Sequence, residues 1–262
     1  TGVQTCALPI SRCADGSDVD ARLDALAAAG HPVLEWTLGD RIDLGGEFVR
    51  WEVATAFAGA VLAINPFDEP NVTESKTNTA NVLAELAATG ALPALTPKCT
   101  VDGLQLWVDD ALPSAFADDA ERLVAGQLDR LGARGYIGIQ AYLASTPERA
   151  AALTTLRSAL RDATKRATTV GIGPRFLHST GQLHKGGAPI GWFLQLVAGH
   201  PRDLAIPGRP YTFGQLIDAQ ALGDVRSLAD HGLPVLRVHL GDDPDAGLAR
   251  LTALIERVLA VR

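Results

Sequence analysis

The sequence predicts an α/β fold, and three observations lead to this prediction. Short apolar runs such as residues 33–37 and 136–143 alternate along the chain with longer stretches of helical period. This alternation is typical of a parallel sheet with helices on both faces. The 262 residues suffice for one large domain or two small ones, and 47% hydrophobic with 20% charged residues is an ordinary globular composition.

Charge and composition exclude several classes of partner. A net charge of −7 without a basic stripe argues against a nucleic-acid partner. The longest mainly apolar run, residues 53–64, is too short to span a membrane. The three cysteines (Cys6, Cys13 and Cys99) lack the spacing of a disulfide framework or a metal site, which favours a cytoplasmic location. We expect neither a metal nor another cofactor.

The first twelve residues, TGVQTCALPISR, are expected to be foreign to the protein. They fit no helix or strand period that continues into the residues after them, and they resemble translated sequencing-adapter read-through. The chain also contains no methionine, even at position 1. We therefore set residues 1–12 aside as a non-native tail and expect the chain to be a fragment.

Residues 13–92 are predicted to form the last part of one α/β domain. Apolar residues at helical spacing predict helices over residues 18–29, 44–57 and 70–88. Apolar runs predict strands over residues 33–37 and 60–64. Pro93 and Pro97 then interrupt a stretch without periodicity, so we place a domain boundary there.

Residues 98–262 are predicted to form a second α/β domain, because the same alternation resumes. Strands are expected over residues 104–108, 136–143, 168–172, 191–197 and 235–240. Helices are expected over residues 115–131, 147–165, 213–231 and 245–261. Ser145 or Thr146 is the expected cap of the second of these helices.

The first candidate site is the corner between the predicted strand 60–64 and the helix that comes after it. Glu69, Thr73 and Lys76 are spaced by four and three residues, so they share one helix face. An acid and a lysine near a helix N-terminus suit an anionic substrate. The alternative is an ordinary structural corner, and spacing alone favours it.

The second candidate site is the stretch 173–187, which we predict to be a long loop. Long loops without structure of their own are commonly functional. The side chains that suit a phosphate or serve as acid and base are Arg175, His178, Ser179, Thr180, His184 and Lys185. The alternative is a structural loop with Arg175 paired to an acid. The two histidines lack a carboxylate or cysteine at a fixed spacing, so no metal is expected.

Two stretches resemble a known enzyme family. The segment EVATAFAGAVLAINPFDEPNVTESK, from Glu52 onward, resembles the C-terminal signature of phosphoglucose isomerases. The matched positions are Asn65, Phe67, Asp68, Val72 and Lys76. Glu69 stands where the family usually has Gln, and Asn71 where it usually has Gly. The segment GPRFLHSTGQLHKGG, residues 173–187, resembles the C-terminal region of bacterial transaldolase/phosphoglucose isomerase fusion proteins.

The resemblance implies a sugar-isomerase (SIS-like) parallel-sheet domain and the interconversion of glucose 6-phosphate and fructose 6-phosphate, a step of glycolysis and gluconeogenesis. It places Lys76 at the sugar ring oxygen during ring opening. It places Glu69 where the family's Gln helps to position the sugar phosphate, although a carboxylate there repels phosphate. The family's base lies upstream, and Glu52 does not match it, so we expect the fragment alone to be inactive.

Two other functions remain open from the sequence. One is a non-catalytic module that binds a sugar phosphate at both candidate sites. The other is an interaction or scaffold domain with neither activity nor ligand. An oligomer of identical chains is compatible with each of them.

Overall fold

The computed structural model describes residues 8–13, 19–68, 70–109, 112 and 119–262. The chain divides into two compact units, residues 1–68 and residues 69–262. Among the described helices, none is both long and apolar enough to cross a membrane.

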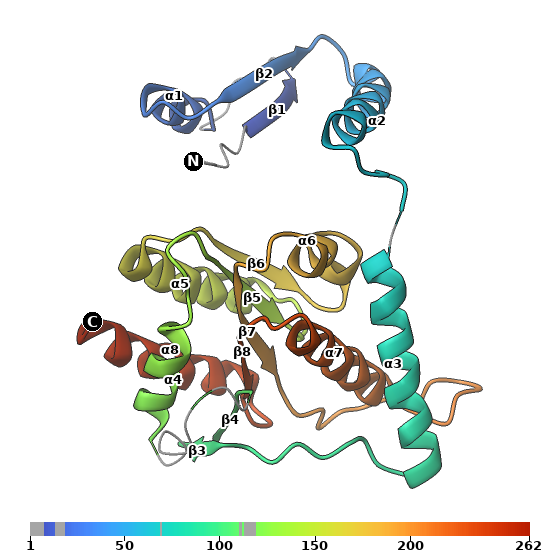
Figure 1. The fold of residues 1–262 in the computed structure, drawn as a ribbon, viewed down its shortest axis with the longest axis vertical. Coiled ribbons are helices and arrows are strands. Elements are labelled where there is room, and N and C mark those ends of the chain that lie inside the picture. Colours follow the sequence, from blue (N-terminus) through green and yellow to red (C-terminus); the bar gives the residue numbers. More distant parts are fainter. Residues whose placement is uncertain (1–7, 14–18, 69, 110–111, 113–118) are drawn as a thin grey trace. The chain divides into compact units, whose positions relative to one another are not determined.

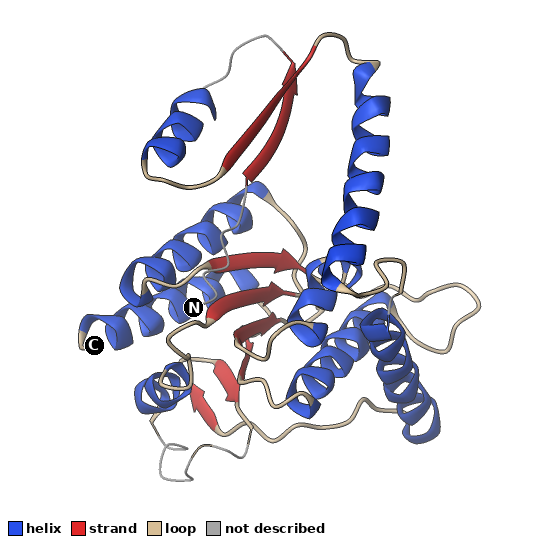
Figure 2. Cartoon of the chain, turned by 45° about the horizontal axis from the view of Figure 1, so that its top comes forward, coloured by secondary structure: helices blue, strands red, loops and turns tan. Residues whose placement is uncertain are grey.

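The described part of the first unit contains a two-stranded parallel sheet and two helices. Its elements are β1 (Leu8–Cys13), α1 (Val19–Ala28), β2 (Val33–Leu38) and α2 (Asp43–Leu62). Figure 2 shows the two strands of this sheet side by side. Their register runs from Leu8 opposite Val33 to Cys13 opposite Leu38. Of the residues 1–12 that we set aside as a non-native tail, residues 8–12 belong to β1, which pairs with the predicted strand β2.

The predicted strand over residues 60–64 is wrong, because helix α2 continues to Leu62. The helix ends at Ala63, which adopts the left-handed conformation with φ of 55°. The N–H of Ile64 donates to the carbonyl of Gly59 at 3.0 Å, as in a common helix C-terminal motif. An alanine-rich apolar run suits a helix as well as a strand, and the preceding helical turns decide the outcome here.

The second unit is an α/β sheet domain, which confirms the predicted α/β class. Its elements are α3 (Pro70–Thr89), β3 (Cys99–Val101), β4 (Leu104–Trp107), α4 (Ala120–Leu128), β5 (Tyr136–Ala141), α5 (Pro147–Thr164), β6 (Thr168–Ile172), η2 (Arg175–His178), α6 (Thr180–Gly186), β7 (Gly191–Val197), α7 (Phe213–Asp230), β8 (Val235–His239) and α8 (Pro244–Ala260). The described strands form a sheet of order β3-β4-β8-β7-β5-β6. The four strands β8, β7, β5 and β6 are parallel. At one edge of the sheet, β4 pairs antiparallel with β8, and β3 pairs antiparallel with β4.

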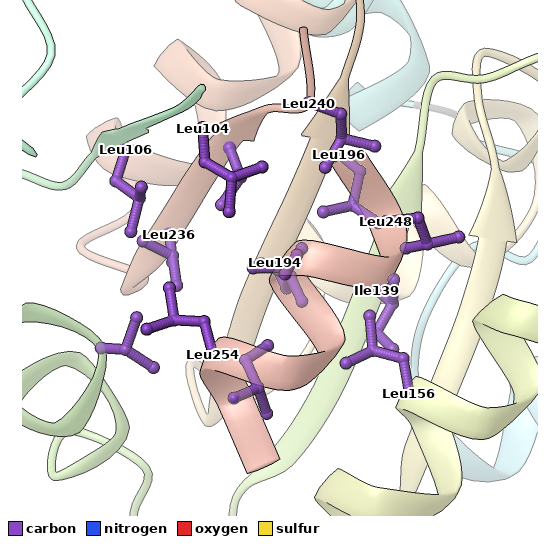
Figure 3. Packing of buried hydrophobic residues seen from close by; sticks show 14 of the residues in the cluster. Leu104, Leu106, Ile139, Leu156, Leu194, Leu196, Leu236, Leu240, Leu248 and Leu254 are labelled. Atoms are coloured by element: carbon purple, nitrogen blue, oxygen red, sulfur yellow. The ribbon is translucent and has the colours of Figure 1, made fainter. Parts of the chain in front are cut away.

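Successive strand residues point to opposite faces of this sheet, so each face has its own core. Ile139, Leu194 and Leu236 belong to the large cluster that α4, α5 and α8 cover (Figure 3). On the other face, Phe193 and Val235 pack with Leu228 of α7. Figure 1 shows α7 with α3 and α6 on that second face. Three layers result, with the sheet in the middle.

Capping residues fix where the helices of this unit begin. The Thr146 side chain accepts from the N–H of Arg149 at 3.2 Å and caps α5, as predicted. Thr212 and Gln215 form a reciprocal capping box at the start of α7. Such caps satisfy N–H groups that have no partner within the helix.

Helix α3 packs with the residues after it in the chain, so the compact units divide after Asp68 and not near residues 93–97. Val82 of α3 is fully buried and clusters with Ala219 and Leu222 of α7. Gly223 allows a close approach, since a Cβ there would lie only 3.1 Å from the backbone nitrogen of Thr79. The helix therefore forms part of the second unit.

Candidate functional site

The structure brings Lys76 and His178 to one cavity of about 200 Å³. Lys76 lies on α3, and His178 is the last residue of η2. The cavity is lined by Val72, Ser75, Lys76, Thr79, Ala80, Leu83, Leu177, His178 and Gln220. Each of the two predicted sites thus contributes one residue to this cavity.

Helical geometry explains which part of α3 reaches the cavity. Val72, Ser75, Thr79 and Leu83 succeed one another at intervals of three and four residues, so they form one stripe of the helix. The neighbouring Lys76 extends an exposed side chain beside that stripe. The opposite wall consists of Leu177 and His178 from η2 with Gln220 from α7.

The cavity offers donors for an anionic ligand above an apolar floor. Its polar groups are an ammonium (Lys76), an imidazole (His178), two hydroxyls (Ser75 and Thr79) and an amide (Gln220). The ammonium, the imidazole and the amide suit a phosphate or a sugar hydroxyl, because each can donate to oxygen. The two hydroxyls already donate within α3, Ser75 to the Asn71 carbonyl and Thr79 to the Ser75 carbonyl, both at 2.9 Å. The residues that line the cavity, all of them described, include no carboxylate.

The remaining residues of the first predicted site do not join Lys76 in this cavity. Thr73 lies on the exposed part of α3, and it is absent from the residues that line the cavity. Glu69 lies outside the described residues. Of Glu69, Thr73 and Lys76, which were predicted to share one helix face, Lys76 therefore lines the cavity.

The predicted loop over residues 173–187 is wrong, because this stretch forms η2 and α6. Phe176 and Leu177 are buried and pack with Tyr142 and Val197 beneath α7. Arg175, Ser179 and Thr180 are exposed around the start of the two helices. The Ser179 hydroxyl donates to the carbonyl of Phe176 at 3.2 Å, so it serves the local turn.

His184 is a core residue, which contradicts its predicted role as a substrate ligand. It is 5% exposed and lies against the rings of Tyr136 and Phe193. Its Nδ1 is hydrogen-bonded to the Tyr136 hydroxyl at 2.7 Å. Burial, with a smaller contribution from the Lys185 charge, lowers the pKa of His184 to about 4, so the ring is neutral at pH 7.

Lys185 is also buried, so it cannot bind phosphate at the surface as predicted. Its Nζ lies 2.6 Å from Oδ1 of Asp224, and the two side chains are 1% and 0% exposed. The same Nζ donates to the hydroxyl of Ser75 at 2.7 Å. Burial raises the pKa of the Asp224 carboxyl, and the Lys185 ammonium acts in the opposite direction.

Reasoning from the sequence missed Ser75, Thr79 and Gln220 as cavity residues. Ser75 and Thr79 carried a usable signal, because they share a helical stripe near Lys76. Gln220 carried no local signal. Its position depends on how α7 packs against α3, and no sequence motif in α7 predicts that packing.

A larger cavity of about 620 Å³ lies beyond the carboxyl ends of β5, β7 and β8. Tyr142, His200 and Asp242 line it, and each comes after one of these strands. The chain leaves β5 toward β6 on one side and returns as β7 on the other, which is the usual position of a ligand in α/β sheets. The sequence signal was limited to His200 and Asp242, each of which lies three residues after the end of its strand.

The charged side chains of this larger cavity are mostly engaged with other protein groups. Nε2 of His200 lies 3.1 Å from Oδ1 of Asp218, and this contact raises the pKa of His200. Arg149 forms two hydrogen bonds to Asp245, at 2.7 and 3.0 Å. Oδ1 of Asp203 accepts from the N–H of Gly214 at the start of α7. In the smaller cavity, Lys76 and His178 are exposed, and neither forms an ion pair or a side-chain hydrogen bond with the described residues. This cavity is therefore the better candidate.

Comparison with known proteins adds little to this geometry. No protein-family model and no curated protein matches the chain. Among solved structures, the chain is similar to the hypothetical protein TT0462 from Thermus thermophilus, with 13% sequence identity and a TM-score of 0.46. The similarity covers 96% of this chain and 56% of that protein, so this chain spans little more than half of its length.

Proposed function

We propose that the chain is part of an aldose–ketose isomerase acting on sugar phosphates, with glucose 6-phosphate and fructose 6-phosphate as its substrates. The observation that carries the proposal is the meeting of Lys76 and His178 at one cavity. These residues come from the two stretches that resemble phosphoglucose isomerases and their transaldolase fusions, and the stretches are far apart in the sequence. The resemblance of residues 52–76 to the isomerase signature also leads us to propose that residues 13–92 derive from the C-terminal part of a sugar-isomerase (SIS-like) domain.

The chemistry requires ring opening followed by movement of a proton between C2 and C1 through an enediol. In the proposal, the ammonium of Lys76 donates to the ring oxygen as the ring opens. His178 and the amide of Gln220 bind the sugar or its phosphate. These contacts orient the substrate, and the Lys76 charge stabilises developing negative charge on oxygen.

The proton transfer at carbon needs a base that the cavity residues do not provide. The lining residues include no carboxylate, and the resemblance places the base upstream of this chain. The chain by itself is therefore proposed to bind the substrate without turning it over. Addition of the native upstream sequence is expected to supply the base.

A second candidate function is a non-catalytic module that binds sugar phosphates. The lack of a carboxylate among the residues lining the cavity favours it. In that case the same donors hold the phosphate, and no reaction occurs with or without the upstream sequence. The two candidates predict the same binding site but different turnover.

The deciding experiment is a coupled glucose 6-phosphate isomerase assay with parallel binding measurements. It uses this chain and a version extended upstream with the native sequence. Lys76→Ala and His178→Gln are each expected to weaken fructose 6-phosphate binding about tenfold or more, because each removes a donor from the cavity. Thr77→Ala is the matched control, since Thr77 is exposed on the same helix and its hydroxyl donates to the Thr73 carbonyl at 3.1 Å.

Each outcome assigns a function. If the extended chain turns over the substrate and Lys76→Ala abolishes this turnover, the isomerase function is supported. Binding without turnover in the extended chain supports the binding module. If neither chain binds a sugar phosphate, both functions are wrong.

A further inference from the structure

We propose that Lys185, Asp224 and Ser75 are positioning residues that hold Lys76 and His178 at the same cavity. The proposal rests on the proposed function for its ligand. Of the three residues, Ser75 already has its hydroxyl engaged by Lys185 and the Asn71 carbonyl where it lines the cavity. Lys185 and Asp224 are absent from the residues that line it. Their effect on a ligand would therefore be transmitted through Lys76 and His178.

One buried ammonium joins three elements. Lys185 lies in α6, the helix directly after His178. Its Nζ lies 2.6 Å from Asp224 of α7 and donates to Ser75 of α3 at 2.7 Å. Ser75 immediately precedes Lys76. The segment that carries His178 and the helix that carries Lys76 are thus tied to the same charge.

Helix geometry explains how the contact between Ser75 and Lys185 fixes the direction of the Lys76 side chain. Adjacent residues lie about 100° apart around a helix, because one turn contains about 3.6 residues. A rotation of α3 that breaks the contact between Ser75 and Lys185 also moves the Lys76 side chain around the helix axis. Ser75 donates in turn to the Asn71 carbonyl at 2.9 Å, so its hydroxyl is held on both sides.

Energetic considerations favour a positioning role over a purely stabilising one. Burying an ion pair removes two charges from water, and apolar residues of similar size often stabilise such a site equally well or better. Val82, Ala219 and Leu222 already pack α3 against α7. Apolar packing alone specifies the rotation of a helix poorly, whereas a buried ammonium accepts few arrangements of its partners.

The test replaces the pair while preserving burial. Lys185→Met with Asp224→Leu removes both charges from the full chain and leaves apolar side chains of similar length. We expect the urea midpoint to stay close to that of the unmodified chain. Fructose 6-phosphate, measured by titration calorimetry, should bind about tenfold to a hundredfold more weakly, because small displacements of positioned groups have effects of this size.

The chain offers a matched control on the same two helices. Arg226 of α7 forms an ion pair with Glu85 of α3 at 3.1 Å, and the two side chains are 38% and 47% exposed. Arg226→Met with Glu85→Leu makes the corresponding change at the surface. This control should leave the dissociation constant for fructose 6-phosphate unchanged. A similar loss in both double variants would overturn the proposal.

A ligand-free readout separates this proposal from the proposed function. The ring resonances of His178 and the side-chain resonances of Lys76 report the geometry of the cavity directly by NMR. We expect both sets to shift in the Lys185→Met, Asp224→Leu chain and to stay in place in the Arg226→Met, Glu85→Leu chain. If the unmodified chain binds no sugar phosphate, the proposed function is wrong and these resonances alone decide the positioning role.

Two single variants provide a test in case the Lys185→Met, Asp224→Leu chain does not fold. Ser75→Ala removes the hydroxyl that accepts from Lys185, and Ser75→Thr retains it. We expect the Lys76 and His178 resonances to shift in the first and to return toward their original positions in the second. Resonances unchanged in Ser75→Ala, or in the folded double variant, would show that the pair does not position these residues.

Discussion

At the scale of single residues, His178 and His184 show how burial assigns different chemistry to one side-chain type. His178 ends η2 and is exposed at a cavity. His184 is enclosed by the rings of Tyr136, Phe176 and Phe193. Burial disfavours the charged imidazole, which lowers the pKa of His184 to about 4. That neutrality makes His184 useful to the core and unsuited to binding a phosphate.

The same shift predicts how stability depends on pH. As pH falls, the unfolded chain protonates this histidine near its ordinary pKa of 6.5, whereas the folded chain does so only near 4. The contribution of His184 is therefore complete above pH 6.5 and is lost between pH 6.5 and 4, with a full size of about 3 kcal/mol. Urea unfolding at pH 7.5 and 4.5 should show this loss, and His184→Gln should remove it from the pH dependence. Leu183→Gln, a neighbouring exposed change without a titrating group, should retain it.

Local patterns predicted some residues of the candidate site and not others. Lys76 and His178 were predicted from their chemistry and from a resemblance, and both line the cavity. His184 and Lys185 were wrong as ligands, because their burial depends on partners far away in the sequence. Lys185 reaches Ser75 and Asp224, and neither contact has a signal in the sequence around residue 185.

At the scale of secondary-structure elements, local pattern succeeded where a run was bounded by clear breaks. Strand β7 spans the residues predicted for it, since its apolar run comes after a proline and glycine turn. The pattern failed at residues 60–64, where an apolar run without such a break continues α2. It also failed at residues 173–187, where Phe176 and Leu177 find tertiary contacts that order a glycine-rich stretch.

The capping box at the start of α7 gives a prediction at this scale. Thr212→Ala removes the hydroxyl that accepts from the N–H of Gln215 at 3.2 Å. We expect a loss of about 1 kcal/mol in the free energy of unfolding, because a helix N–H loses its partner. Thr154→Ala is the control, since Thr154 lies on the exposed part of α5 and bonds back to the Ala150 carbonyl. Urea unfolding should show little change or a slight gain for Thr154→Ala. Equal losses in both variants would contradict the capping argument.

At the scale of the whole molecule, the position of α3 decides where a foldable unit begins. The sequence predicted a boundary between residues 92 and 98, because Pro93 and Pro97 interrupt a stretch without periodicity there. Long-range contacts place α3 with the sheet domain instead. Val72, Val82 and Leu86 are its buried apolar residues, and Ser75 adds the contact with Lys185. A boundary of this kind depends on packing across the chain and not on local composition.

Two chain lengths test this boundary. Residues 69–262 are expected to unfold in one cooperative urea transition. Residues 98–262 lack α3, expose Ala219 and Leu222 of α7, and leave the Lys185–Asp224 pair without its cover. Burial of the three apolar side chains of α3 is worth roughly 5 kcal/mol or more, which is a large part of the total stability of a domain. We therefore expect the shorter chain to unfold at much lower urea concentration and to lose protection of the α7 amides from hydrogen exchange. Equal urea midpoints for the two chains would show that α3 contributes little to the stability of the domain. The contact between Ser75 of α3 and Lys185 could not then position the cavity residues.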